Sequence, residues 1–137
     1  MSKYGRDELE WDELVEAGTA FLVERARLDQ PTTTYTELNT TLVERTGLRG
    51  FDFSQPGDRA AVGHLLGLIV ERDHPQSRLM LSALVRYQGE NDAGSGFYLL
   101  ARQLGLLSKG ASADERTAFW IGQINGLKRL HSGAAAG

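Results

Sequence analysis

Residues 58–72, with the sequence DRAAVGHLLGLIVER, form the most regular pattern in this chain. Apolar residues recur there at the spacing of one helical stripe, and they are Val62, Leu65, Leu66, Ile69 and Val70. Asp58 stands where an N-cap residue is expected. The stretch therefore predicts a helix with one buried face, followed by a turn at residues 73–77, DHPQS.

A second face of this helix carries two glycines, Gly63 and Gly67, beside Ala60 and His64. Glycine lets another group approach the helix backbone closely. It also weakens a helix by up to about 1 kcal/mol relative to alanine. We expect a neighbouring helix to lie against this face, with a ligand or phosphate as the alternative.

Apolar spacing around this stretch predicts four more helices, over residues 7–28, 35–47, 97–105 and 113–131. The second of these begins after Thr34, which has capping-box spacing with Glu37. Apolar residues of the loop over residues 48–57 should pin it to the core. The last helix should bury a stripe of Trp120, Ile121, Ile124 and Leu127 or Lys128.

Residues 79–87, LMLSALVRY, predict a strand that is apolar on both faces. One strand cannot stand alone, so a partner must come from residues 30–34, residues 48–54 or another chain. The expected fold is α+β and mostly helical, with about five helices, one small β-hairpin or short sheet, and a winged-helix-like centre. Trp11 and Trp120 are expected in its core.

The chain has 137 residues, a formal net charge of −3 and no cysteine. We expect one globular domain over residues 1–131 and a disordered tail over residues 132–137. The lack of cysteine excludes disulfides, thiolate zinc sites and cysteine nucleophiles. No apolar run approaches the roughly 20 residues of a membrane helix, and the N-terminus lacks a signal-peptide core, so we expect a cytoplasmic protein.

Three short motifs in the middle of the chain are similar to those of one family. Residues 34–38, TYTEL, are similar to a Thr-Tyr-Gly-Glu-Leu helix start, and residues 59–63, RAAVG, to an Arg-Ala-Val-Gly recognition helix with one residue inserted. Residues 81–86, LSALVR, correspond to a Pro-Cys-His-Arg-Val-Val strand, and a glycine-rich stretch follows at residues 88–96. Roughly half of the chain thus resembles the winged-helix domain of the alkylguanine-DNA alkyltransferases and their alkyltransferase-like relatives. The whole chain also resembles small proteins common in actinobacteria, which implies no activity.

The resemblance implies a DNA-binding winged helix that performs no alkyl transfer, because that reaction needs a cysteine and this chain has none. It places a phosphate contact at a helix N-terminus, a recognition helix, and a wing. The residues expected to bind DNA are Thr34, Tyr35, Thr36, Arg59, His64, Arg78, Arg86, Asn91 and Ser95. The favoured hypothesis is a non-enzymatic domain that binds double-stranded DNA weakly or within a complex.

A protein-interaction adaptor without nucleic-acid contact is the alternative, as a monomer or a symmetric homodimer. Its candidate surfaces are the acidic first helix, the stretch over residues 88–96, and the face of Gly63 and Gly67. DNA binding predicts that Arg59, Arg78 and Arg86 share one face, whereas the adaptor hypothesis predicts that they scatter or pair with carboxylates.

An enzyme is the third class. A small hydrolase would need Ser82 with His64 or His74 and Asp73, but Ser82 lacks the G-x-S-x-G context of a nucleophile elbow. No metal-binding spacing and no dinucleotide fingerprint occur in the sequence. We therefore expect no catalytic residue, no metal and no cofactor.

Overall fold

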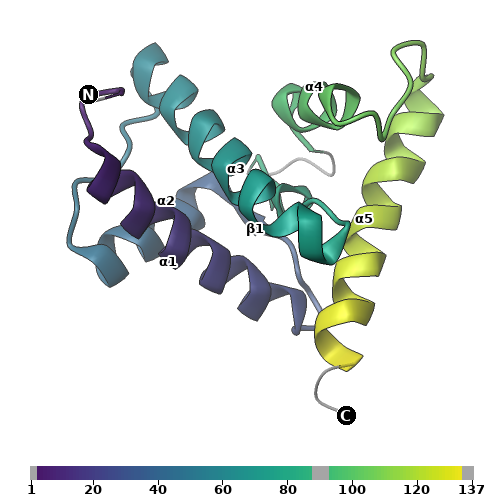
Figure 1. Cartoon of the computed structure of the whole chain (residues 1–137), viewed down its shortest axis with the longest axis horizontal. Helices are drawn as coiled ribbons and strands as arrows, with labels where there is room; N and C mark the ends of the chain where they lie inside the picture. Colours follow the sequence, from purple (N-terminus) through teal and green to yellow (C-terminus); the bar gives the residue numbers. More distant parts are fainter. Residues whose placement is uncertain (1–2, 88–92, 134–137) are drawn as a thin grey trace.

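The computed structural model describes residues 3–87 and 93–133. Its elements are, in chain order, α1 (Glu8–Ala26), β1 (Thr33–Thr34), α2 (Tyr35–Thr46), α3 (Pro56–Ser77), the 3-10 turn η1 (Leu81–Leu84), β2 (Val85–Arg86), α4 (Ser95–Gln103) and α5 (Ala113–Gly133) (Figure 1). The expected class, α+β and mostly helical with a short sheet, is confirmed.

The centre of the molecule is the turn η1, which contacts α1, α3 and α5. Residues 80–85 are all buried there, and among them Ser82 is the polar one. The predicted strand over residues 79–87 is wrong except at Val85 and Arg86. Burial on every side explains the apolar run equally well, because helices enclose this segment and no long strand lies beside it within residues 3–87 and 93–133.

The two short strands pair in parallel, Thr33 with Val85 and Thr34 with Arg86. The partner thus comes from residues 30–34, and the sheet ends where α2 begins at Tyr35. Because this strand has a partner within the same chain, strand pairing no longer supports a homodimer. An antiparallel bridge joins Arg86 to Ala93. Residues 88–92 of the expected wing, Asn91 included, lie outside the described residues.

The ends of α2 form as predicted. Thr34 accepts a hydrogen bond from the N–H of Glu37 at 3.1 Å, and Gly47 closes the helix with a φ of 72°. In α3 the expected cap is wrong, because the N-cap is Gln55 and Pro56 occupies the first turn. Asp58 instead accepts a hydrogen bond from the N–H of Asp52 at 2.7 Å.

Helix α3 is longer than expected at its C-terminal end. The predicted turn over residues 73–77 is wrong, since the helix continues through Pro75 to Ser77. Pro75 removes one N–H bond and crowds the carbonyl four residues earlier, and the helix ends two residues after it. The stop comes from Arg78, which takes a left-handed conformation with a φ of 63° and donates its N–H to His74 at 2.8 Å.

Helix α5 contacts η1, and α4 lies between α3 and α5 (Figure 1). Helix α4 closes near Gly105, as predicted, with a φ of 75° at that glycine, but it begins at Ser95, two residues before the predicted start. Helix α5 runs to Gly133, so residues 132–133 are not tail, and residues 134–137 are not described. Ile121 is 46% exposed and does not belong to the buried stripe of α5.

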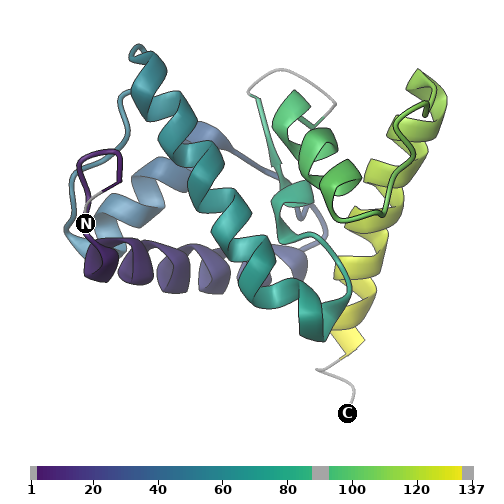
Figure 2. The ribbon, with the colours of Figure 1, turned by 45° about the horizontal axis from the view of Figure 1, so that its top comes forward.

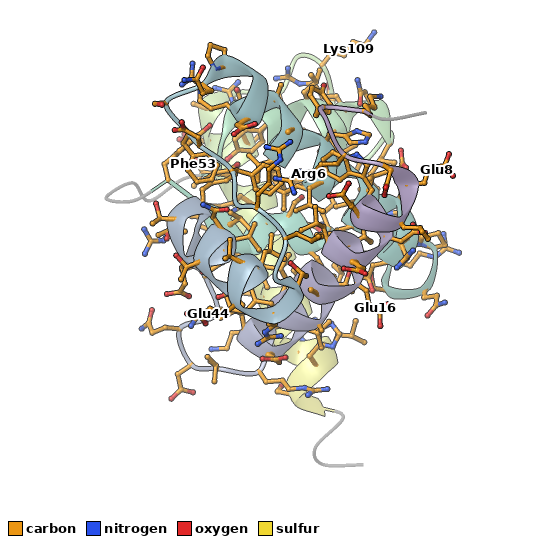
Figure 3. All side chains as sticks on the ribbon, turned by 90° about the vertical axis from the view of Figure 1, so that its left-hand side faces the viewer. Arg6, Glu8, Glu16, Glu44, Phe53 and Lys109 are labelled. Carbon is orange, nitrogen blue, oxygen red and sulfur yellow. The ribbon has the colours of Figure 1, made fainter. Side chains whose placement is uncertain are left out.

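Both tryptophans lie in the core, as expected, and each indole donates to a backbone carbonyl: Trp11 to Lys3 at 3.0 Å and Trp120 to Ala83 at 2.8 Å. The core also contains a buried arginine, Arg6. Arg6 is 1% exposed and donates to the carbonyl of Arg49 at 2.8 Å. Figure 3 shows Arg6 inside the molecule, with Glu16 and Glu44 at its surface. No helix among the described residues is both long and apolar enough to cross a membrane.

Candidate functional site

Two adjoining cavities of about 400 Å³ each lie between α3 and α4. Tyr35, Gly63 and Gly96 line both of them, so they form one continuous depression, called here the α3–α4 groove. Helix α4 lies beside α3, on the side away from α1 (Figure 2). The start of α2 contributes to the lining where the two cavities adjoin, because Tyr35 is its first residue and lines both.

Glycines keep both walls of the groove bare. No described atom lies within 4 Å of a β-carbon placed on Gly63, Gly67 or Gly96. The expectation that a neighbouring helix covers Gly63 and Gly67 is therefore wrong. Close approaches occur instead at Gly18, where a β-carbon would lie 2.8 Å from Ile69 of α3, and at Gly126, where it would lie 3.0 Å from Leu79 between α3 and η1.

The first cavity, called the Ser82 cavity, reaches η1 at its floor. Its buried lining residues are Leu66, Ser82 and Phe97. The Ser82 hydroxyl is buried and has no hydrogen-bond partner among the described residues. An unpartnered buried hydroxyl costs free energy. The other buried residues of this cavity, Leu66 and Phe97, are apolar. Exposed Glu71 and Gln103 lie at the rim.

The second cavity, called the Arg59 cavity, lies toward the first turns of α2 and α3. Thr36, Phe53, Arg59 and Tyr87 line it together with Tyr35. The Arg59 guanidinium donates to the carbonyl of Phe53 at 2.7 Å, which holds this exposed side chain over the cavity. The cavity thus combines aromatic walls with a fixed positive charge.

Tyr35 and Tyr87 form an aromatic pair, with ring centroids 4.8 Å apart and ring planes tilted by 34°. Burial, the neighbouring Tyr87 and a hydrogen bond to its hydroxyl raise the pKa of Tyr35 to about 12. Its phenol is therefore neutral near pH 7. A β-carbon on Gly94 would lie 3.0 Å from the Tyr87 ring, so the small residue before α4 makes room for the pair.

His64 lines the Ser82 cavity but packs toward the N-terminal segment. Its ring lies 4.9 Å from Trp11 and 5.7 Å from Tyr4, measured between centroids. Burial, and then the charge of Lys3, lowers its pKa below the usual 6.5. A neutral imidazole offers no positive charge to a phosphate. No hydrogen bond joins His64 to the Ser82 hydroxyl within the described part of the chain, so a nucleophile–base pair is not formed there.

Of the residues expected to bind DNA, some line the groove, Arg78 lies at the far end of α3, and the remaining ones lie elsewhere. Tyr35, Thr36, Arg59 and His64 line the α3–α4 groove. Arg78 follows Arg59 by nineteen residues, which places the two about 28 Å apart at opposite ends of α3. Arg59, Arg78 and Arg86 therefore do not form one cluster.

The remaining members of that set stand elsewhere. The hydroxyl of Thr34 caps α2, and Arg86 donates to Thr32 at 3.4 Å. Ser95 is exposed at the start of α4, and Asn91 lies outside the described ranges. No group of three or more histidines and acidic residues that could hold a metal occurs within residues 3–87 and 93–133.

Sequence reasoning missed several residues of the groove, among them Phe53, Gly96, Phe97 and Leu99. Ser82 was considered only as a nucleophile, although a polar residue inside the apolar run at residues 79–85 signals a buried hydroxyl. Comparisons with protein-family models, curated proteins and solved structures found no match to this chain.

Proposed function

We propose that this protein is a non-enzymatic interaction module that binds a short segment of a partner protein in the α3–α4 groove. One observation carries the proposal: Gly63, Gly67 and Gly96 leave the walls of the groove bare, with nothing described within 4 Å of their β-carbon positions. Three glycines within helices lower helix stability. The binding of a partner segment in the space that they leave would compensate for this loss of helix stability.

The charges of the groove suit a segment with opposite charges at its two ends. Arg59 lines one cavity and Glu71 the other, and Glu71 follows Arg59 by twelve residues of α3, about 18 Å. An extended segment of about five to six residues covers this distance. Neither side chain has an ion pair within the described ranges. The segment should carry an acidic residue at the Arg59 end and a basic residue at the Glu71 end.

Apolar anchors would fill the two cavities between these charges. Interfaces gain most of their binding energy from a few side chains in well-packed, desolvated pockets. Leu66 and Phe97 offer such a lining in the first cavity, and Phe53 and Tyr87 in the second. The groove therefore favours a segment with two apolar side chains between two opposite charges.

Selection from a random peptide display library tests the proposal. The wild-type protein is compared with Gly67→Leu, which fills the groove, and with Gly122→Leu. Gly122 is an exposed glycine of α5 that also has nothing described within 4 Å of its β-carbon position, so it controls for an added leucine. We expect one peptide family on the wild type and Gly122→Leu, and none of it on Gly67→Leu. Equal enrichment on all three proteins would contradict the proposal.

Weak binding of double-stranded DNA is the second candidate function, and one observation favours it. Tyr35 and Thr36 at the N-terminus of α2 share the Arg59 cavity with the arginine itself, so phosphate-binding groups meet there. Fluorescence anisotropy with a labelled duplex at two salt concentrations tests it. Salt-sensitive binding that is lost in Arg59→Glu and kept in Arg129→Glu, an exposed site on α5, supports this candidate. No binding at low salt removes it.

A further inference from the structure

We propose that the Arg59 cavity binds the C-terminal residue of the partner segment, with the terminal carboxylate on the Arg59 guanidinium and an aromatic side chain among the surrounding rings. The inference rests on the proposed function and names the end of the segment that the groove takes. It starts from two features that meet in one cavity of about 400 Å³, a cation held in place and a cluster of three rings.

The cation has a free edge for a carboxylate. Nη1 of Arg59 donates to the carbonyl of Phe53 at 2.7 Å, whereas Nε and Nη2 have no partner within the described ranges. A guanidinium edge of this kind binds a carboxylate through two parallel hydrogen bonds. No acidic residue lines this cavity among the residues that the structure describes, so the negative charge has to come from the occupant.

The amount of charge favours a carboxylate over a phosphate. Arg59 is the one cation among the described residues that line this cavity, and Thr36 adds only a neutral hydroxyl. A carboxylate carries one negative charge, which one guanidinium balances, whereas a phosphate monoester carries about 1.5 to 2. The occupant therefore presents a single carboxylate.

Aromatic rings define the body of the occupant. The Tyr35 ring lies 4.8 Å from Tyr87 and 6.4 Å from Phe53, measured between centroids, and all three line the cavity. Tyr87 is 50% exposed and the other two are half-buried, so the rings offer apolar surface to a ligand. Gly63 and Gly96 leave space in the same lining. An aromatic side chain packs on such rings in an edge or offset arrangement.

A C-terminal aromatic residue supplies both groups at once. Its carboxylate and its side chain leave the same α-carbon, so one residue places a charge on Arg59 and a ring in the same cavity. An internal aspartate or glutamate has no ring, and a second residue would have to enter the cavity to fill it. The acidic group expected at the Arg59 end of the segment is therefore its terminal carboxylate. The basic residue that Glu71 attracts then lies about five positions before it.

Two display libraries of random hexapeptides separate a terminal from an internal carboxylate. In one library the hexapeptide ends the displayed chain, and in the other a Gly-Ser spacer follows it, so that its last residue has no free carboxylate. We expect the wild-type protein to enrich peptides with an aromatic last residue from the first library only. Enrichment of one peptide family from both libraries would overturn the terminal mode and leave the groove as proposed. No enrichment from either library would overturn both.

The best peptide is then synthesised as the free acid and as the C-terminal amide, and calorimetry measures both on the full chain. We expect the acid to bind about tenfold more tightly, at the low end for hydrogen bonds to charged groups, because Arg59 is exposed. In Arg59→Gln the acid and the amide should differ by less than about twofold. Arg129→Gln, an exposed site on α5, should keep the tenfold difference.

Thermal unfolding checks that both variants are folded, which we expect because the two arginines are exposed. An acid that binds no more tightly than its amide, or a difference that survives in Arg59→Gln, would overturn the terminal carboxylate while the peptide still reports on the groove. N-acetyl-phenylalanine that binds as tightly as the whole peptide would overturn it too, because the occupant would then be a small aromatic acid.

Discussion

The two sides of α3 use glycine in opposite ways. Toward α1, Gly18 lets the helices come so close that an added β-carbon would lie 2.8 Å from Ile69. Toward α4, Gly63 and Gly67 have no described atom within 4 Å of that position. A glycine can therefore mark a tight contact or an open surface, and its own burial distinguishes the two. Gly18 is buried, whereas Gly63 is exposed.

The largest difference between the two sides should be in stability. Leu65 is fully buried, and its truncation to alanine should lower the free energy of unfolding by about 2–5 kcal/mol. Leu99 lines the groove and is 55% exposed, so Leu99→Ala should lower it by less than about 1 kcal/mol. Urea denaturation of both variants measures the contrast. Equal losses would show that the open side is part of the core.

The tyrosine pair that lines the groove gives a pH-dependent contrast. Tyr35 has its pKa raised from 10 to about 12, so the unfolded chain releases this proton first. Stability should therefore fall between pH 10 and about 12, by at most about 2–3 kcal/mol from this group. Tyrosinate absorbance during a pH titration measures the late component, which Tyr35→Phe should remove. A titration that ends near pH 10 would contradict the burial of the phenol.

Alanine at the two kinds of glycine should separate them by a smaller amount. Gly67→Ala should raise the free energy of unfolding by up to about 1 kcal/mol, because the helix gains and no described atom is displaced. Gly18→Ala must shift the end of Ile69, so its helical gain should be cancelled or reversed. Urea midpoints of the two variants test this. An equal gain at both positions would remove the distinction between the packed and the open side.

The smallest effect should come from the histidine at the rim of the groove. Burial lowers the pKa of His64 below 6.5, so protonation favours the unfolded chain, and stability should fall as the pH drops below 6.5. His64→Gln should show a weaker loss as the pH falls below 6.5, measured by thermal unfolding. A variant that loses as much stability as the wild type would assign the pH dependence to other groups.

Local signals in the sequence predicted the helices. The spacing of Val62, Leu65 and Ile69, and the cap formed by Thr34, depend on residues within a few positions, and both appear in the structure. The conformation of residues 79–87 could not be predicted from such local signals. A run buried on all sides has the same composition whether it forms a strand or an irregular turn.

The site could be predicted only in part, because it is assembled from distant segments. Glycine spacing singled out Gly63 and Gly67, and the resemblance singled out Tyr35 and Arg59, but nothing local placed Phe97 opposite them. The polar residue in an apolar run was visible in the sequence at Ser82.

The central claim is that the α3–α4 groove binds a segment of another protein. Calorimetric titration of the best display-selected peptide against the wild type, Gly67→Leu and Gly122→Leu tests it most directly. The account predicts equal dissociation constants for the wild type and Gly122→Leu, and a loss of at least about tenfold in Gly67→Leu. The same affinity in all three proteins would contradict it, because the filled groove would then be irrelevant to binding.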